Sequence, residues 1–341
     1  MNSFERYMGM VQGETVDWVP RIPILMHFAA RHIGATYGDF ARDYRVLVEA
    51  NRRVVEDYGI DQLDIMSDPW RETADFGGEI AYLEDAVPRC VHAPLEDSKD
   101  LEALGKLDPY TAERMRNALD AVRAFKEFGW RKYSITGWVE GPAAEAADVR
   151  GVTNFLIDLV SDEPFACDLM DLCIENAIDF AHAQIKEGAD TIGVGDAIAS
   201  QVSPGTYERL IFPREKRLVD AIHEGGGLLR LHICGDINHL LPRIAALGVD
   251  IVDCDWMVDM EAARRVLGPR VTLTGNLDPV NAVMKSTPDR IRKGFQEIYN
   301  KVGNPYFVNA GCEIPVDTPP ENLRALCEPI RALCEPIPAA H

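Results

Sequence analysis

The stretch LRLHICGDINHLL, residues 229–241, combines a strand, a turn and a helix start. Its first part belongs to a largely apolar run from Gly227 to Ile233, which is typical of a parallel strand buried on both faces. Asp236 then supplies a residue type that favours the N-cap of a helix. His232 and Cys234 lie at the carboxyl end of the predicted strand. The stretch therefore predicts a strand-then-helix unit that carries two metal-ligand residue types.

The same unit recurs along the whole chain. Helical patterns separate the strand-like runs, and the longest of them, residues 154–188, has a 3.6-residue period and ends at Gly188. Strands that alternate with helices predict a (β/α)8 barrel, and a doubly wound open sheet is the alternative on this pattern. The predicted strands are residues 21–27, 61–66, 132–138, 190–195, 227–233, 250–254, 270–274 and 306–310.

The length of 341 residues suits one α/β barrel with insertions, so we predict a single domain over residues 1–341. The long stretch at about 69–131, between the second and third predicted strands, predicts an inserted lobe over the barrel mouth. The heptapeptide RALCEPI occurs twice in tandem, at 324–330 and 331–337. Its prolines limit any helix there, so a packed or frayed tail is expected.

The charge balance excludes several classes of partner. Acidic residues outnumber basic ones by 55 to 35, giving a formal net charge of −20, which argues against nucleic acid and against anionic membranes. The chain has no uninterrupted apolar run of the roughly 18 residues that a spanning helix needs. The start, MNSFERYMGM, lacks the order of a secretory signal. We therefore expect a cytoplasmic protein whose eight cysteines are thiols or metal ligands.

Polar residues follow nearly every predicted strand. Active sites of (β/α)8 barrels lie at the carboxyl ends of the strands, so residues far apart in sequence should converge on one cleft. In chain order these residues are His27, Asp68, Glu140, Asp196, His232 with Cys234, Asp255, Asn276 with Asp278, and Cys312.

Three of these residues predict a zinc site. His232 and Cys234 are two apart on an extended segment, so their side chains point the same way. Cys312 lies in NAGCEIP, where Gly311 permits a tight turn, and the fifth and eighth strands are expected to face each other across the mouth. One histidine and two cysteines form a donor set that zinc prefers, and three ligands with one exchangeable position describe a catalytic site. The alternative is a hydrogen-bonded core histidine with two inert buried thiols.

Other strand-end residues are candidates for the same cleft. Glu140, in GWVEGPA, is a candidate catalytic residue and a fourth zinc ligand that yields to substrate; a capping or ion-paired acid is the alternative. Asp255 is the next candidate ligand, or an acceptor behind the ligands. Asp196, Asn276 and Asp278 are candidates to hydrogen-bond a polar ring or amide of the substrate, although each residue type is also common as a helix cap.

Three motifs resemble the uroporphyrinogen decarboxylase superfamily, a set of (β/α)8 barrels: LTGNLDP, DCDWMVD and GCEIPVDTPPENLRAL. The resemblance covers most of the chain from about Gly137 onward. Its decarboxylase branch implies a catalytic aspartate at Asp68, in SDPW. However, the matching N-terminal region has Arg31 without paired arginines, and Cys312 and Glu313 stand where that branch has a histidine between glycines. Both departures count against a porphyrinogen substrate.

The second branch, the zinc-dependent corrinoid methyltransferases, matches His232, Cys234 and Cys312 residue by residue. This resemblance implies transfer of a methyl group from methylcobalamin on a partner corrinoid protein to a small acceptor. For this acceptor we predict tetrahydrofolate as co-substrate, and a homodimer is a possible assembly. Tetrahydrofolate is preferred because Glu140 and the aspartates suit a pterin ring. The alternatives are transfer to the thiol of coenzyme M, a decarboxylase using Asp68, and a non-catalytic corrinoid or metal carrier.

Overall fold

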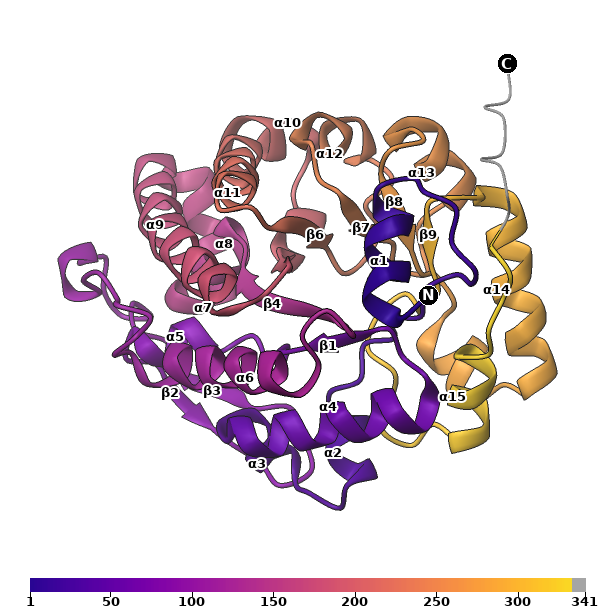
Figure 1. Cartoon of the computed structure of the whole chain (residues 1–341). Coiled ribbons are helices and arrows are strands. Elements are labelled where there is room, and N and C mark those ends of the chain that lie inside the picture. Colours follow the sequence, from indigo (N-terminus) through magenta and orange to yellow (C-terminus); the bar gives the residue numbers. More distant parts are fainter. Residues whose placement is uncertain (333–341) are drawn as a thin grey trace.

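A curled sheet of parallel strands forms the centre of the protein (Figure 1). The computed structural model describes residues 1–332, so the second RALCEPI copy lies almost wholly outside the described residues. Within them, seven of the eight predicted strands are confirmed, and they neighbour one another in chain order. They are β1 (Gln62–Asp64), β4 (Ser134–Glu140), β5 (Thr191–Gly195), β6 (Leu228–His232), β7 (Ile251–Asp253), β8 (Thr272–Thr274) and β9 (Tyr306–Phe307).

The segment predicted as the first strand, residues 21–27, joins the two edges of this sheet. The backbone N–H of Ile22 donates to the carbonyl of Val308, just after β9, at 2.9 Å. On the other side, the carbonyl of Arg21 accepts from the N–H of Asp61, just before β1, at 2.9 Å. These bonds favour the predicted (β/α)8 barrel over the doubly wound open sheet, whose edges stay apart.

Two prolines explain why this segment forms bridges and no regular strand. Pro20 and Pro23 flank the bridging residues and have no backbone N–H to donate to a ladder. The pairing is therefore limited to an isolated parallel bridge between Arg21 and Val308. The prediction of a strand over residues 21–27 was wrong in this respect.

Helices surround the sheet (Figure 1). The helix predicted over 154–188 is two helices, because Pro164 cannot lie in a helix interior and the chain breaks at Asp162. No helix of residues 1–332 is long and apolar enough to cross a membrane. The main helices are α1 (Ser3–Val11), α2 (His27–His32), α3 (Tyr37–Arg42), α4 (Tyr44–Tyr58), α7 (Pro142–Arg150), α8 (Val152–Ser161), α9 (Glu163–Glu187), α10 (Pro204–Thr206), α11 (Phe212–Glu224), α12 (Leu241–Leu247), α13 (Met260–Leu267), α14 (Pro288–Val302) and α15 (Pro320–Leu326).

The range predicted as an inserted lobe, 69–131, contains two kinds of structure. Helix α5 (Arg71–Asp75) precedes an antiparallel hairpin of β2 (Glu79–Ala81) and β3 (Arg89–His92). Helix α6 (Glu113–Gly129), in contrast, packs against α4 and α9 in the outer helical layer. The inserted lobe therefore stays a prediction. The assignment of residues 1–341 to a single domain also stays a prediction.

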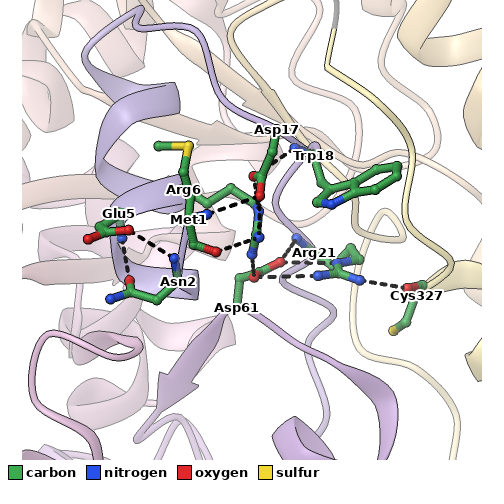
Figure 2. Close-up of polar contacts among 9 residues, drawn as sticks. All are labelled: Met1, Asn2, Glu5, Arg6, Asp17, Trp18, Arg21, Asp61 and Cys327. Carbon is green, nitrogen blue, oxygen red and sulfur yellow. Dashed lines mark hydrogen bonds and ion pairs between the residues drawn. The ribbon is translucent and has the colours of Figure 1, made fainter.

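A buried ion network fixes the closure of the sheet at the amino end of β1 (Figure 2). The fully buried Asp61 carboxylate accepts from Arg6 Nη1 at 2.7 Å and from Arg21 Nε at 3.1 Å. Arg6 also donates to Asp17 at 2.8 Å, and Arg21 donates to the carbonyl of Cys327 at 3.2 Å. Asp61 thus connects α1, the bridging segment and the end of α15.

We expect Asp61→Asn to cost about 3–5 kcal/mol of unfolding free energy, because two largely buried guanidinium groups lose their shared counter-charge. Urea unfolding at neutral pH measures the loss. Asp317→Asn is the control, since it removes an exposed ion pair with Arg31 and should cost much less. Equal losses for the two variants would contradict the role given to Asp61.

Candidate metal centre

Three ligand-type side chains meet at the carboxyl end of β6. His232 is the last residue of the strand, Cys234 follows two residues later, and Cys312 arrives from beyond β9. His232 Nε2 lies 3.1 Å from the sulfur of Cys234 and 3.9 Å from that of Cys312. The two sulfurs are 3.7 Å apart. All three ligand atoms lie within 4.8 Å of one another, so they can share one ion.

These distances fit tetrahedral zinc. With Zn–S bonds of about 2.3 Å and a Zn–N bond of about 2.0 Å, tetrahedral angles put sulfurs about 3.8 Å apart and a nitrogen and sulfur about 3.5 Å apart. The sulfur separation agrees, and the two nitrogen–sulfur distances lie on either side of that value. Cys234 and Cys312 are only partly buried, which leaves access for a fourth, exchangeable ligand.

The path of the chain after β9 brings Cys312 to this place. Ala310 pairs with Leu277 beyond β8, and Gly311 donates its N–H to the carbonyl of Leu277 at 2.8 Å. A Cβ on Gly311 would overlap the backbone nitrogen of Trp256, beyond β7. The chain therefore crosses the ends of β8 and β7 to reach β6. This corrects the expectation that the fifth and eighth strands face each other, since only β7 and β8 separate them.

A charged chain inside the barrel orients the histidine. His232 Nδ1 lies 3.0 Å from a carboxylate oxygen of Asp253, and Arg230 Nε donates to the same oxygen at 2.8 Å. Arg230 is fully buried. The carboxylate favours the tautomer with a proton on Nδ1, which leaves Nε2 free to bind a metal.

Sequence reasoning missed both Arg230 and Asp253. Each precedes a predicted site residue by two positions, so it shares that residue's side of the strand. Asp253 is also paired in register with His232, on the neighbouring strand. The alternation of side chains along each strand could therefore have identified both residues from the sequence. The pairing of Asp253 with His232 on the neighbouring strand, in contrast, is known only from the fold.

The two cysteines have different proton affinities. A hydrogen bond from Cys234, and then one from His232, lower the pKa of the Cys312 thiol to about 4. Cys234 is the donor of the hydrogen bond between the two sulfurs, and donating it raises the pKa of the Cys234 thiol. One thiolate is thus stabilised by the protein itself, which favours capture of a soft cation.

Glu140 lies near this group but outside it. It ends β4, and its Oε1 accepts from Trp138 Nε1 at 2.9 Å; the Trp138 ring in turn lies 6.0 Å from the His232 ring, centroid to centroid. Burial, followed by the charge of Glu72, raises the pKa of Glu140 well above its ordinary value. Glu140 is not among the three residues whose ligand atoms meet, so its predicted roles as fourth ligand and catalytic residue stay predictions.

Asp255 and Asn276 hold the backbone around the cysteines. The Asp255 carboxylate accepts from the N–H of Gly235 and from that of Trp256, both at 2.6 Å. Asn276 Nδ2 donates to the carbonyls of Asp255 and Val258 at 3.0 and 2.8 Å. This geometry fits the second role predicted for Asp255, in which its carboxylate accepts hydrogen bonds from groups next to the ligands and does not itself bind the metal. Contact of either residue with substrate stays a prediction.

The remaining candidates have structural partners. Asp196 is fully buried and accepts from the N–H groups of Ala143 and Ala144 in α7, at 3.3 and 2.8 Å. Asp278 caps a π-helical turn, Pro279–Met284, through two backbone N–H groups. Asp68 forms a buried ion pair with Arg114 at 2.7 Å. Binding of substrate by Asp196 and Asp278, and catalysis by Asp68, stay predictions.

Comparison with known proteins adds a family. The family model described as Uroporphyrinogen decarboxylase (URO-D) matches residues 2–333. The chain is 31% identical over 235 residues to the methylcobamide:CoM methyltransferase MtbA of Methanosarcina mazei, covering 67% of this chain and 68% of that protein. It is 30% identical over 334 residues to the uroporphyrinogen decarboxylase of Trichormus variabilis, covering 92% of each.

Two solved structures share the fold. A methyltransferase from Methanosarcina mazei superposes with a TM-score of 0.88 at 23% identity, over 96% of this chain and 97% of that one. A B12-independent methionine synthase from Shewanella sp. W3-18-1 superposes with a TM-score of 0.56 at 12% identity, over 92% and 94%. Both likenesses support the barrel-like architecture.

We expect Asp253→Asn to weaken zinc binding by about 10–100-fold, because the amide cannot hold His232 in the metal-binding tautomer with the same strength. Competition with a chromophoric chelator measures the affinity. Asp278→Asn removes a carboxylate outside the cluster and should leave the affinity unchanged. A wild-type affinity in Asp253→Asn would contradict the proposed orientation.

Gly311→Ala should lower the zinc affinity by about tenfold or more, because the added Cβ displaces the segment that carries Cys312. Gly205→Ala is a matched control, since a Cβ there has only Ser203 Oγ within 4 Å, at 3.9 Å. The same chelator competition applies. If both variants bind zinc like the wild type, the close crossing at Gly311 does not govern the site.

Proposed function

The chain belongs to the uroporphyrinogen decarboxylase family, and we propose that within this family it is a zinc-dependent methyltransferase that moves a methyl group from a methylated corrinoid protein to a thiol. The observation that carries this proposal is the cluster of His232, Cys234 and Cys312. The relatives compared above are enzymes of two kinds, a decarboxylase and a corrinoid methyltransferase. The cluster is the feature that favours the second kind.

Three soft ligands suit thiol chemistry. Zinc held by His232, Cys234 and Cys312 would lower the pKa of a bound thiol, so that the acceptor would be a thiolate at neutral pH. The protein's own part is to keep the ligand atoms in place: Asp253 fixes His232, and Asp255 fixes the backbone next to Cys234. In the proposed reaction, the acceptor sulfur forms a bond to the methyl carbon, and the cobalt–carbon bond breaks with its electron pair left on cobalt.

A thiol acceptor is better supported than tetrahydrofolate, the acceptor expected from sequence. That expectation depended on carboxylates free to bind a pterin, but Asp196 and Asp278 both accept from backbone N–H groups, and Glu140 is bonded to Trp138. The relative with 31% identity is named for transfer to coenzyme M. We therefore propose coenzyme M, or a thiol like it, as the acceptor.

A decarboxylase centred on Asp68 is the second candidate, because decarboxylase relatives cover 92% of the chain. The Asp68 carboxylate already accepts from Arg114 Nη2 and from Ser67 Oγ, both at 2.7 Å. This pairing leaves Asp68 with less capacity to contact a substrate. The cluster around Cys312 would have no part in that reaction.

We expect zinc-loaded protein to demethylate free methylcobalamin with coenzyme M under anaerobic conditions, followed by the change in corrinoid absorption. Cys234→Ser and Cys312→Ser should each lower the rate at least about a hundredfold, because each removes a soft ligand. Cys90→Ser, on β3 and outside the cluster, is the control.

Three outcomes would contradict the proposal. The first is a full transfer rate in both cysteine variants. The second is faster transfer to tetrahydrofolate than to coenzyme M, which would favour the acceptor predicted from sequence. The third is release of carbon dioxide from uroporphyrinogen that depends on Asp68, with no methyl transfer.

A further inference from the structure

The turn Asp255–Val258 exposes two large apolar side chains beside the candidate ligands. Trp256 is 51% exposed and Met257 is 40% exposed. The turn follows β7, at the carboxyl ends of the strands where the metal cluster lies. Exposed aromatic and sulfur-containing side chains at one place on a surface are typical of a contact site.

This turn lies between the two loops that carry the cysteines. On one side, its backbone nitrogen at Trp256 contacts Gly311, next to Cys312. On the other side, the Met257 methyl group lies 4.0 Å from where a Cβ of Gly235 would be, next to Cys234. Anything that covers Trp256 and Met257 is therefore adjacent to the open coordination position.

Hydrogen bonds fix the turn before any partner binds. Asn276 Nδ2 donates to the carbonyls of Asp255 and Val258, and Val258 N–H donates to the Asp255 carbonyl at 2.9 Å. From the neighbouring loop, Asn238 Nδ2 donates to the carbonyl of Met257 at 3.1 Å. The backbone is thus held while both apolar side chains face solvent, which lowers the entropic cost of binding a partner here.

We propose that the corrin ring of the methyl donor packs against Trp256 and Met257. This inference depends on the proposed function. The methyl carbon must come within bonding reach of a sulfur at the cluster. The ring that carries it is far broader than the cluster, so it must also cover the adjoining rim. A flat indole and a polarisable thioether suit a broad, weakly polar ring. A small thiol, in contrast, can reach the cluster without touching the rim.

The test compares two exposed tryptophans at opposite ends of the sheet. Trp130 is 58% exposed and precedes β4, at the amino ends of the strands, so Trp130→Ala is the matched control. With free methylcobalamin as the probe, Trp256→Ala should raise KM for methylcobalamin about tenfold. Met257→Ala should raise it less, and Trp256→Phe should recover most of the loss. KM for coenzyme M and the zinc content should match the wild type.

Binding is measured independently of turnover. Methylcobalamin should quench the tryptophan fluorescence of the wild type and of Trp130→Ala at the same concentrations, and Trp256→Ala should need about tenfold more. An unchanged KM for methylcobalamin in both Trp256→Ala and Met257→Ala would overturn the inference. So would a rise confined to coenzyme M, or a change in oligomeric mass, which would assign the surface to a second copy of the chain. In each of these cases wild-type transfer persists, whereas failure of the wild type to turn over methylcobalamin would refute the proposed function itself.

Discussion

The close crossing of the chain at Gly311 is the constraint on which the candidate site depends. Cys234 and Cys312 are 78 residues apart in sequence, and their sulfurs lie 3.7 Å apart in space. This approach requires the segment after β9 to pass over the ends of β8 and β7, with Gly311 against the backbone of Asp255 and Trp256. Only a residue without a side chain can lie that close. The cluster of His232, Cys234 and Cys312 is therefore a product of the closed sheet and of one backbone contact above it.

The interior of the barrel supports the same site from below. Arg230 is fully buried, and its charge is offset by Asp253, which in turn holds His232. Charges buried in this way are costly unless they are paired and hydrogen-bonded, so this chain of groups is a constraint on the position of the histidine ring. A second buried pair of opposite charges, Arg21 and Asp61, closes the sheet at its other end. The fold and the site thus depend on buried ions at both ends of the strands.

Much of this architecture could be predicted from sequence, and the exceptions have physical causes. Buried parallel strands leave a strong apolar pattern, which identified seven strands, whereas Pro20 and Pro23 reduced the first to a bridge. His232, Cys234 and Cys312 were identifiable because soft donors at strand ends are chemically distinctive. Asp253 was not identified, because its partner depends on the register between β6 and β7. From sequence alone, Asp196 and Asp278 could each be a substrate-binding residue or a helix cap. Only the structure shows the backbone N–H groups from which each of them accepts a hydrogen bond.

X-ray absorption at the zinc edge tests the central claim most directly. We predict one zinc per chain with two sulfur neighbours at about 2.3 Å and nitrogen or oxygen neighbours at about 2.0–2.1 Å. Addition of coenzyme M should raise the sulfur count from two to three, because the thiol takes the exchangeable position. A shell of nitrogen and oxygen alone, or a sulfur count that the thiol leaves unchanged, would contradict the account.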